Sequence, residues 1–114
     1  MHEASIALNV IEIITEQCRQ QGYSAIESVR LEIGTASGLL PDSLRFAFDI
    51  IKKGTIANDA ELILDINLVG GHCQDCKTKF ESKERLVFAC PACGSSSIRI
   101  NKGHEMKIVD MEVN

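Results

Sequence analysis

Apolar residues recur at helical spacing near the start of the chain, and this pattern predicts an amphipathic helix over residues 4–21. Its apolar face holds Ala7, Ile11, Ile14 and Cys18, with Ile6, Val10 and Ile13 beside them. Gly22 stands where a helix C-cap glycine is common. Because Cys18 lies on the apolar face, its thiol is expected to be a buried and inert core group.

Later segments alternate between apolar and polar residues, which is the pattern of a half-buried strand. Four segments show this period of two, namely residues 26–33, 61–69, 98–100 and 105–113. The inward side chains predicted for the second segment are Leu62, Leu64, Ile66 and Leu68. Between the first two strands, Pro41 and Gly54 mark the start and the end of a second helix.

This order of elements indicates an α+β fold in which two helices pack on a small mixed sheet. The pair Gly70-Gly71 is expected to act as a hinge at the start of an inserted module. The predicted organisation is an α+β domain of residues 1–69 and 96–114, interrupted by a zinc-ribbon-like module of residues 70–95. The last strand is expected to return to the first sheet.

Four cysteines of the inserted module stand in two matched C-x-x-C pairs, Cys73–Cys76 and Cys90–Cys93. One tight turn can aim both sulfurs of a pair at one point, and two such turns supply the four thiolates of a closed tetrahedral zinc site. The thirteen residues between the pairs suffice for a short ribbon that brings the turns face to face. Four sulfurs leave no open coordination position, so zinc here is predicted to hold structure and to do no chemistry.

Other uses of these sulfurs stay open at this point. Two disulfides or a redox dithiol would use the same cysteines, although two pairs favour a metal. Rubredoxin-like iron would also suit the second turn, and a red purified protein would indicate it. The main alternative function is a zinc ribbon that docks nucleic acid or a protein. The formal net charge of −4 and the scarcity of aromatic residues, four Phe and one Tyr, argue against nucleic acid.

The first three residues form a second candidate metal site. Histidine is too large for the initiator methionine to be removed before it, so Met1 is expected to keep a free amine. That amine, the His2 backbone nitrogen and His2 Nδ1 can close two chelate rings on one metal, with the Glu3 amide or carboxylate nearby. Such a nitrogen-rich set suits Ni(II) or Cu(II) better than zinc. On its own, a histidine at position 2 is more often a solvated terminus.

Composition narrows the class of protein further. Five cysteines without a signal-peptide pattern indicate a reducing compartment, so a cytoplasmic protein is expected. No apolar run reaches the length of about eighteen residues that would suggest a membrane-spanning helix. The residues show no serine–histidine–acid set, phosphate-binding glycine loop or open zinc site, so the chain is not expected to be an enzyme.

The start Met1-His2-Glu3, the helix and strand that follow it, and the paired C-x-x-C motifs together resemble the HypA/HybF family of hydrogenase maturation nickel chaperones. Further matching segments are 31–34, 41–48 and 54–57, so the resemblance covers essentially the whole chain. It implies nickel bound through His2 with support from Glu3. The zinc ligands that it implies are Cys73, Cys76, Cys90 and Cys93.

The resemblance also implies partners. Members of that family work with a nickel-handling GTPase to load the large subunit of [NiFe]-hydrogenase, and in some organisms they serve urease with its accessory proteins. A homodimer stays open. Some relatives carry an extra histidine between the cysteine pairs, but this chain has none there, so a further nickel ligand is not identified. His72 and His104 are left as auxiliary candidates. His72 could touch the zinc shell or replace one of its ligands, although four cysteines already suffice. His104 is more readily explained as an exposed side chain.

Overall fold

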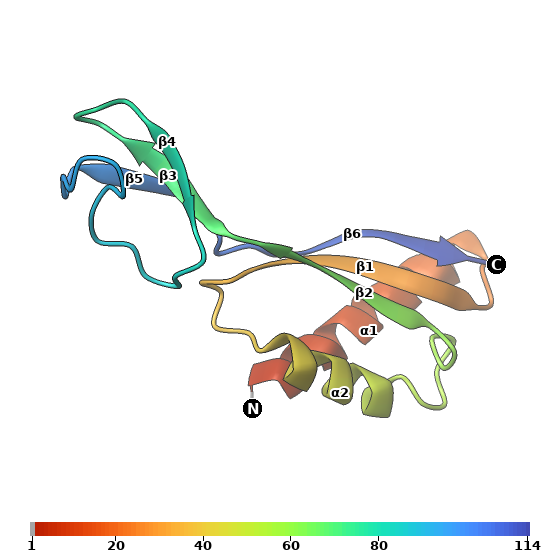
Figure 1. The fold of residues 1–114 in the computed structure, drawn as a ribbon. Coiled ribbons are helices and arrows are strands. Elements are labelled where there is room, and N and C mark those ends of the chain that lie inside the picture. The colour runs from red at the N-terminus through yellow and green to blue at the C-terminus, as the bar shows by residue number, and fades with distance from the viewer. Residues whose placement is uncertain (1) are drawn as a thin grey trace. The chain divides into compact units, whose positions relative to one another are not determined.

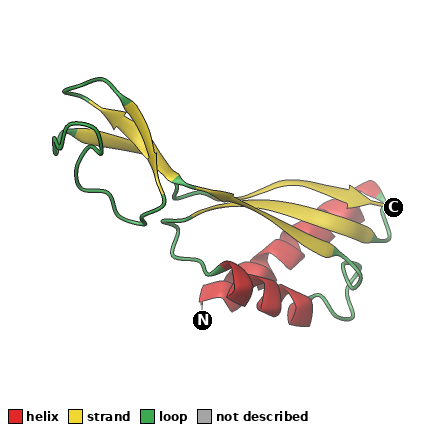
Figure 2. Ribbon diagram, in the orientation of Figure 1, coloured by secondary structure: helices red, strands yellow, loops and turns green. Residues whose placement is uncertain are grey.

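The computed structural model describes residues 2–114, with the backbone alone for His2. Its elements are α1 (His2–Gln21), β1 (Ile26–Gly34), α2 (Pro41–Ile51), β2 (Glu61–Asn67), β3 (Val69–Cys73), β4 (Lys79–Ser82), β5 (Ile98–Lys102) and β6 (Met106–Val113) (Figure 1). The strands form two three-stranded sheets, in the orders β2-β1-β6 and β4-β3-β5 (Figure 2). This arrangement confirms the predicted α+β class. No helix in residues 2–114 is long and apolar enough to cross a membrane.

The chain divides into two compact units, and three strands run from one unit into the other. Unit 1 contains Met1–Leu31, Leu39–Asp65 and Lys107–Asn114, and unit 2 contains Glu32–Gly38 and Ile66–Met106. Unit 2 thus interrupts unit 1 along the sequence. The domain boundaries at residues 70 and 95 that were inferred from the sequence stay a prediction.

Unit 1 is held together by the apolar faces of its two helices, which lie on the same side of the β2-β1-β6 sheet (Figure 1). Ile14 and Cys18 of α1, and Leu44 and Phe48 of α2, are at most 1 % exposed. Burying each large apolar side chain contributes about 1.5–3 kcal/mol, so this face supplies most of the stability of unit 1. Burial also raises the pKa of the Cys18 thiol, as expected for an inert core cysteine.

One of the predicted inward residues of β2 is wrong. Ile66 is 45 % exposed, whereas Leu62 of the same strand is 4 % exposed. Ile66 is also the residue at which the chain passes from unit 1 to unit 2. A period of two identifies which side chains share a face, but it does not say where the layer that covers this face ends.

In unit 2, β3 is the central strand and pairs antiparallel with β4 and with β5. The expected hinge at Gly70-Gly71 is wrong, because both glycines lie inside β3 and both are buried. A Cβ atom on Gly71 would collide with the Arg99 carbonyl oxygen of β5. The glycine is therefore explained by a close approach of two strands, which only a residue without a side chain permits.

Candidate metal centre

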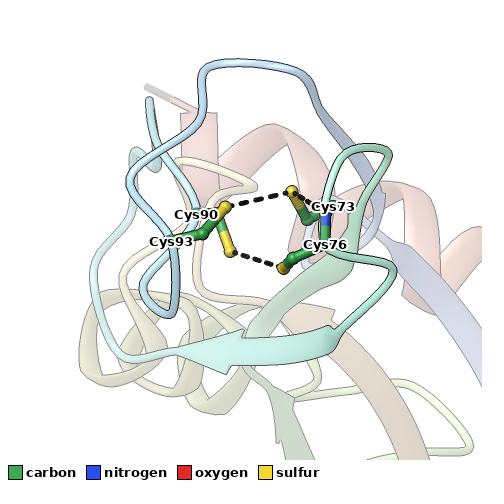
Figure 3. Close-up of side chains that lie close together, drawn as sticks. All are labelled: Cys73, Cys76, Cys90 and Cys93. Atoms are coloured by element: carbon green, nitrogen blue, oxygen red, sulfur yellow. Dashed lines mark hydrogen bonds between the residues drawn. The ribbon is translucent and has the colours of Figure 1, made fainter.

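Four cysteine side chains converge on one point in unit 2 (Figure 3). Cys73 is the last residue of β3 and Cys76 follows it in a turn, while Cys90 and Cys93 come from the loop between β4 and β5. The Sγ atoms of Cys73 and Cys93 are 3.6 Å apart, and those of Cys76 and Cys90 are 3.7 Å apart. All four sulfurs lie within 4.8 Å of one another.

The two C-x-x-C turns share one backbone hydrogen bond, and in each turn a different backbone N–H donates to the first sulfur. In the first turn, Lys77 N–H donates to the Cys73 carbonyl at 3.0 Å, and Cys76 N–H donates to Cys73 Sγ at 3.4 Å. In the second turn, Gly94 N–H donates to the Cys90 carbonyl at 2.8 Å, and Ala92 N–H donates to Cys90 Sγ at 3.4 Å. These bonds hold the first sulfur of each pair inside its own turn.

The distances between the sulfurs fit zinc. Four sulfurs at the usual Zn–S distance of ~2.3 Å form a tetrahedron with edges of about 3.8 Å, close to the two observed separations. A disulfide requires an S–S distance of about 2.05 Å, and all five cysteines of the chain are free. The four sulfurs therefore form a closed four-thiolate cluster that fits a structural zinc ion.

Two of the four thiols in the cluster have shifted pKa values, in opposite directions. Hydrogen bonds from the Thr78 hydroxyl and then from its backbone N–H lower the pKa of Cys76 to about 6. The Ser95 backbone N–H lowers the pKa of Cys93, but the other sulfurs, led by Cys73, and desolvation outweigh it and raise that pKa to about 12. Cys76 thus ionises more readily than an ordinary thiol and Cys93 less readily, and a divalent metal at the cluster would favour the thiolate form of both.

Side chains that were not singled out from the sequence link the two turns. The Ser95 hydroxyl donates to the Asp75 carboxylate, and the Ser97 hydroxyl donates to Gln74 Oε1 at 3.3 Å. Gln74 N–H also donates to the Ser97 carbonyl at 2.8 Å. Only the register of the two turns brings these residues together, so a run of three serines in the sequence does not reveal which of them take part.

The two turns differ in the residue that closes them, and this difference can be tested. Gly94 closes the second turn with φ 78°, while Lys77 closes the first with φ 63°. A side chain in this left-handed region costs about 1–2 kcal/mol. We expect Gly94→Ala to lower the free energy of unfolding of the zinc-loaded protein by ~1 kcal/mol, because a Cβ there meets no atom within 4 Å. Lys77→Gly should raise the free energy of unfolding, because glycine adopts the left-handed region without the cost of a side chain. Urea denaturation measures both changes.

The predicted nickel site lies mostly outside the described residues, which exclude Met1 and the His2 side chain. Glu3 is described, in the first turn of α1, and is half-buried. Its Oε2 accepts a hydrogen bond of 3.3 Å from the backbone N–H of Leu40, the residue that precedes α2 and has no side-chain cap of its own. The Glu3 carboxylate is thereby fixed beside a hollow of about 490 Å³.

Neither His72 nor His104 joins the cysteine cluster among residues 2–114. His72 is half-buried in β3, and His104 is exposed in the turn before β6. The cysteine cluster and the Glu3 region belong to different units, unit 2 and unit 1.

The fold and the four-cysteine cluster define a small α+β protein whose four thiols fit a closed structural metal site. A family model described as "Hydrogenase/urease nickel incorporation, metallochaperone, hypA" matches residues 1–113. The chain therefore belongs to the HypA family, which confirms the resemblance noted from the sequence.

Curated relatives and solved structures agree with this assignment. The hydrogenase maturation factor HypA of Rhizobium leguminosarum bv. viciae is 42 % identical, and that of Methylocella silvestris is 36 % identical, each over 99 % of both chains. The solution structure of the Ni metallochaperone HypA from Helicobacter pylori is 25 % identical, with a TM-score of 0.67 over 97 % of this chain and 96 % of that one. A second HypA solution structure is 27 % identical, with a TM-score of 0.72 over 100 % of this chain and 97 % of that one.

Proposed function

We propose that this chain is a nickel metallochaperone that binds Ni(II) and delivers it during maturation of [NiFe]-hydrogenase. The observation that carries the proposal is the match of the nickel-incorporation family model to residues 1–113, because it includes the N-terminal residues at which nickel was expected. Zinc in the four-cysteine site would hold unit 2 in shape, and nickel would be transported cargo. No catalytic residue is assigned.

The proposed nickel ligands are the Met1 amine, the His2 backbone nitrogen and Nδ1, and Glu3 as a supporting group. Two features of the described residues support this set. First, α1 begins at His2, so the amides of His2 and Glu3 belong to the first turn of a helix and have no acceptor within it. Second, the hydrogen bond from Leu40 keeps the Glu3 carboxylate close to that turn.

The proposed partners are a nickel-handling maturation GTPase and the hydrogenase large subunit, with urease accessory proteins as further candidates. Nucleotide hydrolysis would belong to the GTPase. The proposed location is the cytoplasm, where reduced thiols are available for zinc.

Nickel titration of matched histidine variants tests the nickel site. We expect His2→Ala to weaken Ni(II) binding by about tenfold or more, or ~1.4 kcal/mol, because an imidazole ligand is lost. His104→Ala is the control, since it removes an exposed histidine that lies outside the proposed site. Calorimetry and metal analysis should show one zinc per chain in all three proteins. Equal nickel affinities for wild type and His2→Ala would remove His2 from the site.

A further inference from the structure

One face of the β4-β3-β5 sheet carries a cross-strand row of basic residues. His72 in the central strand is paired with Lys79 of β4 on one side and with Arg99 of β5 on the other. Directly paired residues in adjacent strands point to the same face of a sheet. The side chains of Arg99, His72 and Lys79 therefore stand in a row across the sheet.

The neighbouring row of the same sheet shows how such charges are balanced within the protein. There Gly70 of β3 is paired with Glu81 of β4 and with Lys102 of β5. Lys102 crosses the central strand where Gly70 has no side chain, since a Cβ on Gly70 would meet the Lys102 side chain. Lys102 then forms an ion pair with Glu81. A cation on one edge strand is thus neutralised by a carboxylate on the other.

The row through His72 has no such carboxylate. Lys79 and Arg99 are exposed, and within residues 2–114 neither makes an ion pair with an acidic side chain. His72, Lys79, Glu81 and Lys102 line a hollow of about 520 Å³ on this part of the sheet. Two cations on the edge strands therefore flank a half-buried histidine, and neither forms an ion pair within the described residues. The hollow adjoins His72 and Lys79 but not Arg99, and Glu81 at its border is already paired with Lys102.

The distribution of charge along the chain narrows the class of partner. Unit 2 has six Lys and Arg residues against five Asp and Glu residues, whereas the rest of the chain has six against eleven. A long polyanion such as nucleic acid would be repelled by the acidic remainder of the chain. A short acidic segment that contacts unit 2 alone would avoid this repulsion.

We infer that the Arg99–His72–Lys79 row is a docking site for an acidic segment of a partner protein. A carboxylate of that segment would lie across His72 and take the place that Glu81 occupies in the neighbouring row, with charge-assisted hydrogen bonds to Arg99 and Lys79. The contact would use unit 2 and not the N-terminus. The nickel titration described above and a test of this site can therefore fail independently.

Binding of a labelled acidic peptide to the zinc-loaded protein tests the site. The probe is a fluorescein-labelled peptide of alternating glutamate and serine, about eight residues long, whose carboxylates lie on one face when it is extended. Fluorescence anisotropy at about 50 mM salt, where screening is moderate, measures its affinity. We expect Lys79→Glu and Arg99→Glu each to weaken binding by about tenfold or more. Lys53→Glu makes the same charge change in unit 1 and should alter the affinity by less than about twofold.

Several outcomes would overturn the inference. If Lys53→Glu weakened peptide binding as much as Lys79→Glu, binding would depend on the net charge of the protein and not on the row. Equally tight binding of a glutamine–serine peptide would exclude recognition of carboxylates. If single-stranded DNA of the same charge bound equally tightly, the ligand of the site would be a nucleic acid and not an acidic protein segment. If an equal concentration of acetate displaced the peptide, the row would be a site for small anions. Unchanged zinc content and circular dichroism in each variant show that any loss is not due to unfolding.

Discussion

Adding residues before Met1 is expected to weaken nickel binding by about tenfold or more, equivalent to ~1.4 kcal/mol. An extension turns the terminal amine into an amide, which is a much poorer ligand, and so removes one donor of the proposed chelate. Acetylation of the amine should have the same effect with little added bulk. Nickel affinity can be measured by calorimetry on tag-free, extended and acetylated protein, each with zinc in place.

The same tag placed after Asn114 is the matched control. The C-terminus lies in unit 1, where Asn114 N–H donates to the Ala25 carbonyl at 2.9 Å and the Asn114 carbonyl accepts a bond of 2.9 Å from Ser24 N–H. A C-terminal tag should leave the nickel affinity unchanged. If both tags left it unchanged, the nickel ligands would have to be sought elsewhere, first at His72 and His104.

Replacing Cys73 or Cys90 by serine is expected to abolish stoichiometric zinc binding and to unfold much of unit 2. Structural zinc contributes on the order of 10–16 kcal/mol to the folding of a small four-ligand site, and one lost thiolate removes much of this free energy. Four apolar side chains of unit 2 are buried, those of Ile33, Val69, Cys73 and Cys90, so little apolar burial remains to hold it. Metal analysis gives the zinc content, and amide hydrogen exchange over residues 69–102 gives the loss of structure.

Cys18→Ala provides a matched control for these two variants. Cys18 is fully buried in unit 1 and takes no part in the cluster. Its truncation should cost about 1 kcal/mol in the stability of unit 1 and leave one zinc per chain. If Cys73→Ser or Cys90→Ser kept full zinc stoichiometry, the four-thiolate assignment would be wrong.

Much of unit 1 could be predicted from the sequence because its elements bury one face each. The period of the apolar residues places α1 and β1 within two residues of their observed bounds, and Pro41 marks the first residue of α2. The pattern misses the first turn of α1, since neither His2 nor Glu3 is an apolar residue that would extend the helical period. That turn contains the residues proposed to bind nickel.

The second sheet could not be predicted in the same way. Its central strand β3 contains Gly70 and Gly71, which have no side chains and therefore no hydrophobic pattern, so the sequence favours a hinge there. The cysteine spacing nevertheless predicts the metal centre, because each C-x-x-C turn brings its two sulfurs together through local geometry. The partners of those sulfurs, Thr78 and Ser95 among them, depend on turn geometry that the sequence does not display.

The late position of strand β6, which ends directly before Asn114, bears on how the chain folds. Strand β6 completes the β2-β1-β6 sheet, yet residues 68–105, most of unit 2, separate it from β2. Until unit 2 is ordered, that length is a flexible loop whose closure costs entropy. Zinc ties Cys73 and Cys76 to Cys90 and Cys93, and so shortens the loop before its ends must meet. Supply of zinc during synthesis would therefore lower the entropic cost of docking the C-terminal strand, and until that strand docks β1 is an unpaired sheet edge.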